Sequence, residues 1–181
     1  AADELRSRLG SIDGATVSPV IVGRATDSRG LPNDPLLSNQ YAIRNVGQPI
    51  EGQPGVFGAD VRAAQAWNLQ RGSARVTIAV IDSGVSSTHP DLAAKLDDGF
   101  NVTGGELSDT DAPLNTHGTH IAGIVAASTD NAEGVVGVSW GSRIVPVKAA
   151  NPIGFTSDVW LAEGLMWAAD QGVDVAVLSF G

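Results

Sequence analysis

Two segments of the chain carry side chains of the kinds that activate a nucleophile. Asp82 ends the apolar, largely β-branched run 76–81, and His117 opens the Gly- and Ala-rich segment 117–127. A carboxylate at the carboxyl end of a buried strand can face a cleft, and a histidine at a helix start can project into one. These residue types predict acid–base chemistry in which Asp82 orients the imidazole of His117.

Both segments also have plainer interpretations. Asp82 begins an Asp-Ser-Gly sequence that often forms a turn, and His117 could simply cap a helix. His117 and His120, three residues apart, could both contact a zinc ion, which would make a metal hydrolase. No glutamate completes a His-Glu-x-x-His pattern and no third ligand is evident in the sequence, so we disfavour zinc. We expect His120 to be buried and structural.

The elements that must position these residues read as a parallel sheet covered by helices. Run 76–81 predicts a strand buried on both faces, 143–148 a second strand and 173–178 a third, buried strand; 117–127 and 157–171 predict helices. This alternation predicts the α/β class, a three-layer fold with a parallel sheet. We expect Gly118 and Gly123 to let the first helix pack closely on a neighbour.

The first part of the chain has a different character. Residues 1–25 predict a short helix and an extended stretch, and 26–58 are rich in turn sequences. So much loop predicts an arm lying over a surface, followed by a helix at 59–69. We therefore divide the chain into residues 1–25, an arm with its helix (26–75), and 76–181.

Composition excludes several classes of function. The 181 residues carry a net charge of −9, which argues against nucleic acid as a partner. The chain has no cysteine, which excludes disulfides and thiolate chemistry. No apolar run reaches the length needed to cross a membrane, and the first ten residues lack the apolar stretch of a signal peptide.

The motifs together resemble those of the subtilisin-like (subtilase, peptidase S8) serine proteases, most closely the thermitase-like branch. Residues 80–85, Val-Ile-Asp-Ser-Gly-Val, resemble the family's aspartate motif, and His-Pro-Asp-Leu follows at 89–92. Residues 115–123 resemble its histidine motif, and Ser-Phe-Gly at 179–181 stands at the family's substrate-binding segment. The resemblance covers about residues 26–181. It implies the subtilisin-like fold.

This resemblance implies a serine endopeptidase that hydrolyses peptide bonds in protein substrates. Asp82 and His117 would be catalytic, with His117 acting as general base and then general acid. The backbone of Ser179, Phe180 and Gly181 would pair with an extended peptide as an added strand.

The third member of the expected triad is missing from the sequence. The family's Gly-Thr-Ser-Met-Ala-like segment and its oxyanion asparagine would follow Gly181, so we expect this chain to be the amino-terminal half of a catalytic domain and inactive alone. Ser139 lies in a Gly-x-Ser-x-Gly sequence, but a strand rather than a helix is predicted after it, so we reject it as the nucleophile. The alternative is a degenerate, non-catalytic domain that binds calcium or an extended peptide. The nucleotide sequence beyond the codon for Gly181 distinguishes the two.

The resemblance also implies structural Ca²⁺, which binds several oxygen ligands of mixed type. Asp34, Asp91 and Asn131 would supply side-chain oxygens, whereas Asp34 and Asp91 could instead cap turns. Backbone carbonyls would complete the set, from Ser128, Glu133 and Val135.

Residues 1–25 resemble the end of a subtilase propeptide, which implies that the protein's own propeptide is an inhibitory partner. Maturation would then cut between about Gly23 and Gly30, and the protein would be secreted. Trp140 stands where the family usually has proline, and Ala149–Pro152 depart from its substrate-binding edge. We therefore predict no specificity.

Overall fold

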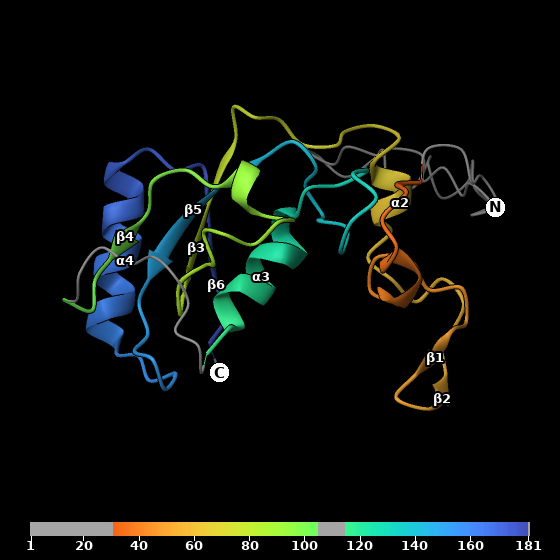
Figure 1. Cartoon of the computed structure of the whole chain (residues 1–181), viewed down its shortest axis with the longest axis horizontal. Helices are drawn as coiled ribbons and strands as arrows, with labels where there is room; N and C mark the ends of the chain where they lie inside the picture. Colours follow the sequence, from red (N-terminus) through yellow and green to blue (C-terminus); the bar gives the residue numbers. More distant parts are fainter. Residues whose placement is uncertain (1–30, 105–114, 181) are drawn as a thin grey trace, which may run out of the picture.

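A four-stranded parallel sheet forms the centre of the molecule. The computed structural model describes residues 31–104 and 115–180, so the predicted propeptide segment 1–25 and the predicted substrate residue Gly181 lie outside the described residues. In spatial order the strands are β4 (Phe100–Asn101), β5 (Arg143–Lys148), β3 (Thr77–Asp82) and β6 (Val175–Leu178). Every neighbouring pair in this sheet is parallel (Figure 1).

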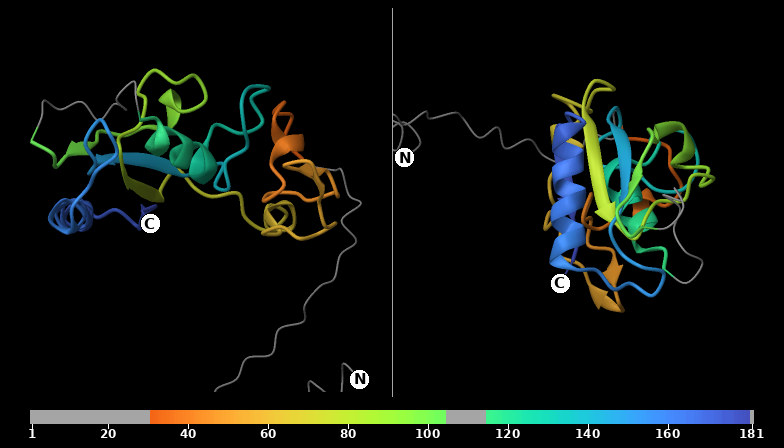
Figure 2. Two further views of the ribbon diagram at one scale, coloured as in Figure 1. Left: turned by 90° about the horizontal axis from the view of Figure 1, so that it is seen from below. Right: turned by 90° about the vertical axis from the view of Figure 1, so that its left-hand side faces the viewer.

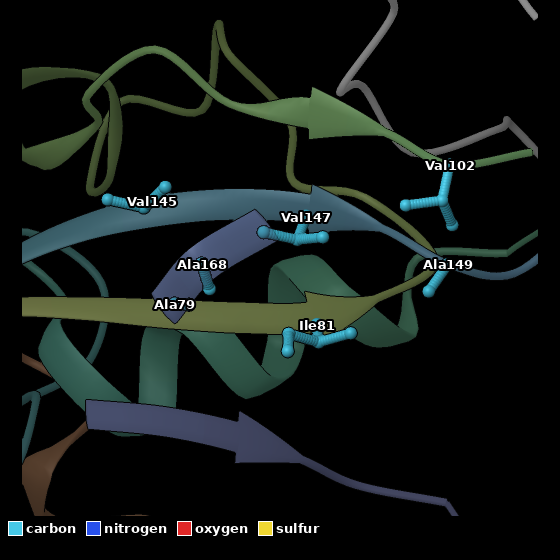
Figure 3. Close-up of a cluster of buried hydrophobic side chains, with 7 residues drawn as sticks. All are labelled: Ala79, Ile81, Val102, Val145, Val147, Ala149 and Ala168. Carbon is cyan, nitrogen blue, oxygen red and sulfur yellow. The ribbon is translucent and has the colours of Figure 1, made fainter. Parts of the chain in front are cut away.

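Two helices cover opposite faces of the sheet and give it three layers. Helix α3 (His117–Ala126) lies on one face and α4 (Asp158–Asp170) on the other (Figure 2). Successive residues of β3 and β5 alternate between two apolar clusters, so both faces of these strands are buried. The cluster on the α4 face, drawn in Figure 3, consists of Ala79, Ile81, Val102, Val145, Val147, Ala149 and Ala168. The cluster on the α3 face consists of Val80, Val85, Leu92, Ala122, Ala126, Ala127 and Ile144.

The sequence pattern predicted four of these elements to within one residue at each end. They are the strands at 76–81 and 143–148 and the helices at 117–127 and 157–171. Ser157, the residue before α4, accepts a hydrogen bond from the amide of Trp160 and caps that helix. The α/β class and the three-layer parallel arrangement are confirmed.

The strand predicted at 173–178 is present in part, but the prediction that it is buried was wrong. β6 covers only Val175–Leu178, and three of its four residues are exposed. Within residues 31–104 and 115–180, β6 pairs with β3 on one side and with no strand on the other. Apolar character indicates a strand, but it does not reveal which strand lies at the edge of a sheet.

The arm contains short elements at one end of the molecule. They are the 3₁₀ helix η1 (Leu37–Asn39), the hairpin strands β1 (Pro49–Ile50) and β2 (Gln53–Pro54), and α2 (Ala63–Ala66); the hairpin projects away from the sheet (Figure 1). The helix predicted at 59–69 is thus a single turn. Arg62 has a φ of 59°, and its amide donates to the carboxylate of Asp60 instead of entering a helix. A second short 3₁₀ helix, η2 (Ala93–Lys95), follows β3.

A small aromatic core holds the arm against the loop before β5. The rings of Trp67 and Trp140 lie 5.1 Å apart, and the guanidinium of Arg71 lies 4.2 Å from the centre of the Trp140 ring. The indole of Trp67 also donates to the carbonyl of Val138 at 2.8 Å. Trp140, where proline is usual in the resembling family, therefore serves to anchor the arm.

Candidate active site

Asp82 is the last residue of β3, at the carboxyl edge of the sheet. Its side chain is only 2% exposed, although it is a carboxylate at the end of an apolar strand. One of its oxygens, Oδ1, accepts a hydrogen bond from the amide of Ser83 at 2.7 Å. A buried carboxylate requires such donors, and the turn after the strand supplies one of them.

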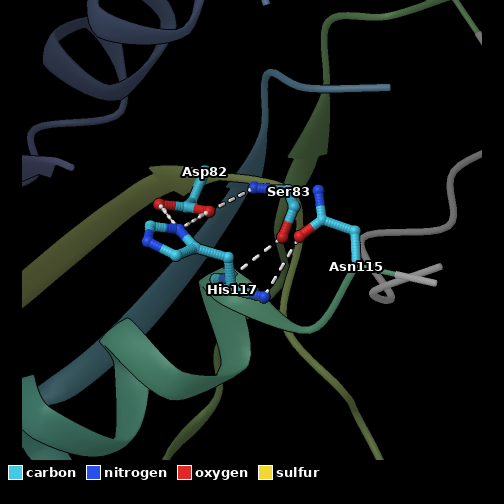
Figure 4. Close-up of polar contacts among 5 residues, drawn as sticks. Asp82, Ser83, Asn115 and His117 are labelled. Atoms are coloured by element: carbon cyan, nitrogen blue, oxygen red, sulfur yellow. Dashed lines mark hydrogen bonds and ion pairs between the residues drawn. The ribbon is translucent and has the colours of Figure 1, made fainter. Parts of the chain in front are cut away.

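The imidazole of His117 is the second partner of this carboxylate. His117 is the first residue of α3, and its Nδ1 lies 2.8 Å from Oδ1 and 3.0 Å from Oδ2 of Asp82 (Figure 4). Half of the His117 side chain is exposed to solvent. With Nδ1 bonded to the acid, Nε2 is left to accept a proton from another group. The predicted Asp82–His117 pair is formed.

The close approach of α3 to the turn after β3 makes this geometry possible. A Cβ on Gly118 would lie 2.1 Å from the carbonyl oxygen of Gly84, so only glycine allows the helix to start there. The predicted role of Gly118 is correct. The same prediction for Gly123 was wrong, because a Cβ there would make only an ordinary contact of 3.7 Å with Val135.

Three polar side chains that the sequence analysis passed over also fix the start of α3. The Oγ of Ser83 accepts from the amide of Gly118 at 2.9 Å, and Oδ1 of Asn115 accepts from the amide of His117 at 3.2 Å. The hydroxyl of Thr119 accepts from the amide of Ser86 at 2.8 Å. The sequence could have indicated these contacts, because Asp-Ser-Gly and Asn-Thr-His-Gly place hydrogen-bonding side chains beside Asp82 and His117.

Ser179 and Phe180, the two predicted substrate-binding residues that the structure describes, lie at the same edge of the sheet. Leu178, the last residue of β6, pairs with Ile81 of β3, so Ser179 follows at the level of Asp82. Ser179 and Phe180 are both exposed.

The predictions for His120 and for Ser139 had different outcomes. His120 is exposed, not buried, because the helix turns it away from the sheet toward a hollow of about 950 Å³ between the arm and α3. In the described part of the chain no three His, Cys, Asp or Glu side chains are grouped as a metal site. Ser139 lies in the irregular segment before β5, where its hydroxyl bonds that of Ser142 at 2.7 Å, and no helix follows it directly.

The predicted calcium residues of the arm and of the loop after α3 lie together. Asp34 is 4% exposed, and its Oδ2 accepts from the amide of Asp130 at 2.8 Å. Its other oxygen, Oδ1, is buried and has no hydrogen-bond partner among the described residues. Asn33 bonds the same loop twice, through Asp130 and Ala132. The arm is thereby attached to the loop.

Asp91 and Asn131 meet on the inner side of that loop. Asp91 is 1% exposed, and its two oxygens accept from Nδ2 of Asn131 at 2.9 Å and from the amide of Val135 at 3.0 Å. Ser128 donates its amide to the carbonyl of Asp91 at 2.8 Å, and Glu133 donates its amide to Oδ1 of Asn131 at 3.1 Å. All six predicted residues therefore lie in or beside one loop.

Comparison with known proteins agrees with this fold. The subtilase family of peptidases matches residues 73–181, a segment that includes β3, α3, Asp82 and His117. The chain belongs to the subtilase family.

Its relatives include a thermophilic serine proteinase and thermitase. The chain is 44% identical over 118 residues to a thermophilic serine proteinase of a Bacillus species, covering 64% of this chain and 28% of the relative. It is 36% identical over 151 residues to thermitase of Thermoactinomyces vulgaris, covering 83% of this chain and 48% of thermitase. This chain therefore spans less than half the length of either relative.

A solved structure supports the same fold. The crystal structure of the complex of Aeromonas sobria serine protease with its chaperone matches with a TM-score of 0.73 at 26% identity, covering 96% of this chain and 29% of that chain. Among the residues that the structure describes, no helix is long and apolar enough to span a membrane.

Proposed function

We propose that this chain is part of a serine endopeptidase that hydrolyses peptide bonds in proteins. The observation that carries the proposal is the hydrogen-bonded pair of Asp82 and His117. Both residues lie in the segment that matches the subtilase family. Several relatives are serine proteases by name, among them a thermophilic serine proteinase, an intracellular serine protease and a halolysin-like extracellular serine protease.

The pair would act through proton transfer. Asp82 holds the Nδ1 edge of the imidazole, so that Nε2 takes the proton of a serine hydroxyl as that hydroxyl attacks the scissile carbonyl. The buried carboxylate then stabilises the imidazolium, and His117 returns the proton to the leaving amine. An extended substrate would lie along Ser179, Phe180 and Gly181, beyond the carboxyl end of β6.

The nucleophile itself is expected outside these 181 residues. Among the described residues, the imidazole of His117 is hydrogen-bonded only to Asp82, so no serine there is in place to be activated. The chain alone is therefore expected to be inactive.

A serine-reactive phosphonate tests the proposal. The protein as its gene encodes it should be labelled at one serine, and labelling should disappear in His117→Ala, because the imidazole activates that serine. The 181-residue chain should neither be labelled nor hydrolyse casein. A full gene product that is never labelled would support a degenerate domain that only binds calcium or peptide.

We propose further that Ca²⁺ binds at the loop after α3. Asp34 provides the supporting observation, because a buried carboxylate oxygen without a donor is costly unless a cation faces it. The other ligands of the Ca²⁺ would be the side chains of Asp91 and Asn131 and the carbonyls of Ser128, Glu133 and Val135. A set of two carboxylates, one amide and backbone carbonyls suits a hard cation.

Calcium titration during thermal unfolding tests this site. At 100 times its dissociation constant, Ca²⁺ should stabilise the chain by about 2.7 kcal/mol. Asp34→Asn should remove most of that gain. Asp60→Asn is the matched control, because both oxygens of Asp60 already accept backbone amides of the arm. No stabilisation by Ca²⁺, or equal loss in both variants, would contradict the proposal.

We propose also that the protein is inhibited by its own propeptide and is exported from the cell. Residues 1–25 are the proposed remnant of an inhibitory propeptide, and the Aeromonas protease was solved in complex with a chaperone. A halolysin-like relative is named as extracellular, whereas another relative is named as an intracellular protease. Export predicts that immunoblots of the source culture detect the protein in the medium, cleaved between about residues 23 and 30. Uncleaved protein confined to cells would contradict it.

A further inference from the structure

The side chain of the cap residue accepts no hydrogen bond from the first turn of α3. Thr116 is the N-cap, yet its side chain bonds none of the helix amides. The first amides of a helix have no partner within the helix and need acceptors from elsewhere. The amide of Gly118 finds one in the Oγ of Ser83, at 2.9 Å. Gly118 is buried, so water is a poor substitute for this acceptor.

Ser83 is also bonded to the catalytic carboxylate. Its amide donates to Oδ1 of Asp82 at 2.7 Å, the same oxygen that faces Nδ1 of His117 at 2.8 Å. Ser83 itself is 2% exposed. One buried residue therefore bonds both the acid, through its backbone, and the helix that carries the base, through its side chain (Figure 4).

A second hydrogen bond restrains the start of α3 against the turn after β3. The hydroxyl of Thr119 accepts from Ser86, so a second bond joins the same turn and helix in the opposite direction. The side chain of Ser83 and that of Thr119 thus link the two segments reciprocally. Loss of the Ser83 hydroxyl would leave the buried amide of Gly118 without this acceptor, and a small withdrawal of the helix start would restore its contact with water. His117, the residue before Gly118, would move with it.

We propose that Ser83 is a positioning residue, whose hydroxyl holds the first turn of α3 so that the imidazole of His117 faces Asp82. The hydroxyl acts through the backbone amide of Gly118, which donates to it. The inference rests on the proposed function for its biological meaning. The geometry it concerns is present in the chain itself and can be measured without any proteolysis.

Nuclear magnetic resonance of the ¹⁵N-labelled chain tests this assignment. The ring Nδ1–H of His117, bonded to Asp82, should give a downfield proton resonance, and loss of that signal in His117→Ala assigns it among the three histidines. In Ser83→Ala its exchange with solvent should be at least about tenfold faster, the factor that weakening of one hydrogen bond produces. Ser83→Thr keeps a hydroxyl acceptor and should restore slow exchange.

Ser142→Ala is the matched control. Ser142 is also 2% exposed and hydrogen-bonded through its hydroxyl, but it precedes β5 at the opposite end of the sheet. It should lower stability while leaving the His117 resonance unchanged. If Ser83→Ala does not fold, Ser83→Cys replaces it, because sulfur fills the space but accepts hydrogen bonds weakly.

The outcomes separate this inference from the proposed function. An unchanged His117 resonance in the Ser83→Ala or Ser83→Cys chain, or an equal change in Ser142→Ala, would overturn the positioning role. A gene product without a reactive serine would contradict the proposed function and leave these resonances as expected.

Discussion

Replacing Gly118 by alanine should separate steric contact from helix propensity within a single helix. A Cβ at this position would lie 2.1 Å from the carbonyl oxygen of Gly84 and 3.1 Å from Cβ of Asp82. The neighbours belong to the end of β3 and the turn after it, and the nearer contact is with rigid backbone. The helix must therefore move away from β3. Overpacking of this kind costs about 1–3 kcal/mol.

Gly123 provides the matched control in the same helix. A Cβ there would meet only Cγ2 of Val135, at 3.7 Å, which is an ordinary contact. Gly123→Ala should stabilise the chain by about 0.4–1 kcal/mol, because alanine reduces the entropy of the unfolded chain and favours helix. The same propensity gain applies to Gly118→Ala, since both glycines lie in α3. The difference between the two variants therefore isolates the clash, and we expect it to be about 1–3 kcal/mol.

Urea unfolding followed by circular dichroism measures both changes. Gly118→Ala should unfold at a lower urea concentration than Gly123→Ala, with similar slopes. It should also weaken the Nδ1–H resonance of His117, which Gly123→Ala leaves in place. Equal unfolding midpoints for the two variants would refute the close contact of α3 with the turn after β3.

Two other substitutions test electrostatics and the loop. Burial, and then the charge of Arg143, lower the pKa of Lys95 from its ordinary 10.5. The folded chain therefore binds fewer protons at Lys95 than the unfolded chain does. The free energy of unfolding should rise with pH between the lowered pKa and 10.5. Lys95→Met should flatten that rise in a series of unfolding curves, and an unchanged slope would contradict the assignment. Gly134→Ala should destabilise the chain and remove its stabilisation by Ca²⁺, because φ is +53° and a Cβ would lie 2.1 Å from Oδ2 of Asp91. Gly104→Ala has the same kind of backbone strain, with φ +79° and no atom of the described residues within 4 Å, and should keep the calcium response. Equal responses would refute the contact with Asp91.

The sequence predicted the centre of the fold well because local pattern and global packing agree there. β3 and β5 are buried on both faces, which is what a continuous apolar run indicates. β6 has the same apolar character but lies at the edge of the described sheet, and sheet order is a long-range property that no local run encodes. The single-turn α2 differs from the predicted helix because one aspartate, Asp60, competes for the amide of Arg62.

The sequence predicted the candidate pair of Asp82 and His117 better than the residues that position this pair. Asp82 and His117 stand in motifs whose order pointed to catalysis, and their side chains meet. Gly118 and Gly123 look alike in a Gly- and Ala-rich helix, and only the neighbouring turn distinguishes them. Ser83 appeared to be an ordinary turn residue, because its acceptor role depends on an amide 35 positions later in the chain.

Casein hydrolysis by the protein as its gene encodes it tests the central claim most directly. We expect activity that His117→Ala and Asp82→Asn each reduce by about 10⁴-fold or more in kcat, the order of magnitude found for serine-protease triads. Ser139→Ala, which alters the Gly-x-Ser-x-Gly sequence away from this pair, should retain full activity. Activity that survives His117→Ala, or that disappears in Ser139→Ala, would contradict the assignment of Asp82 as the orienting carboxylate and His117 as the general base.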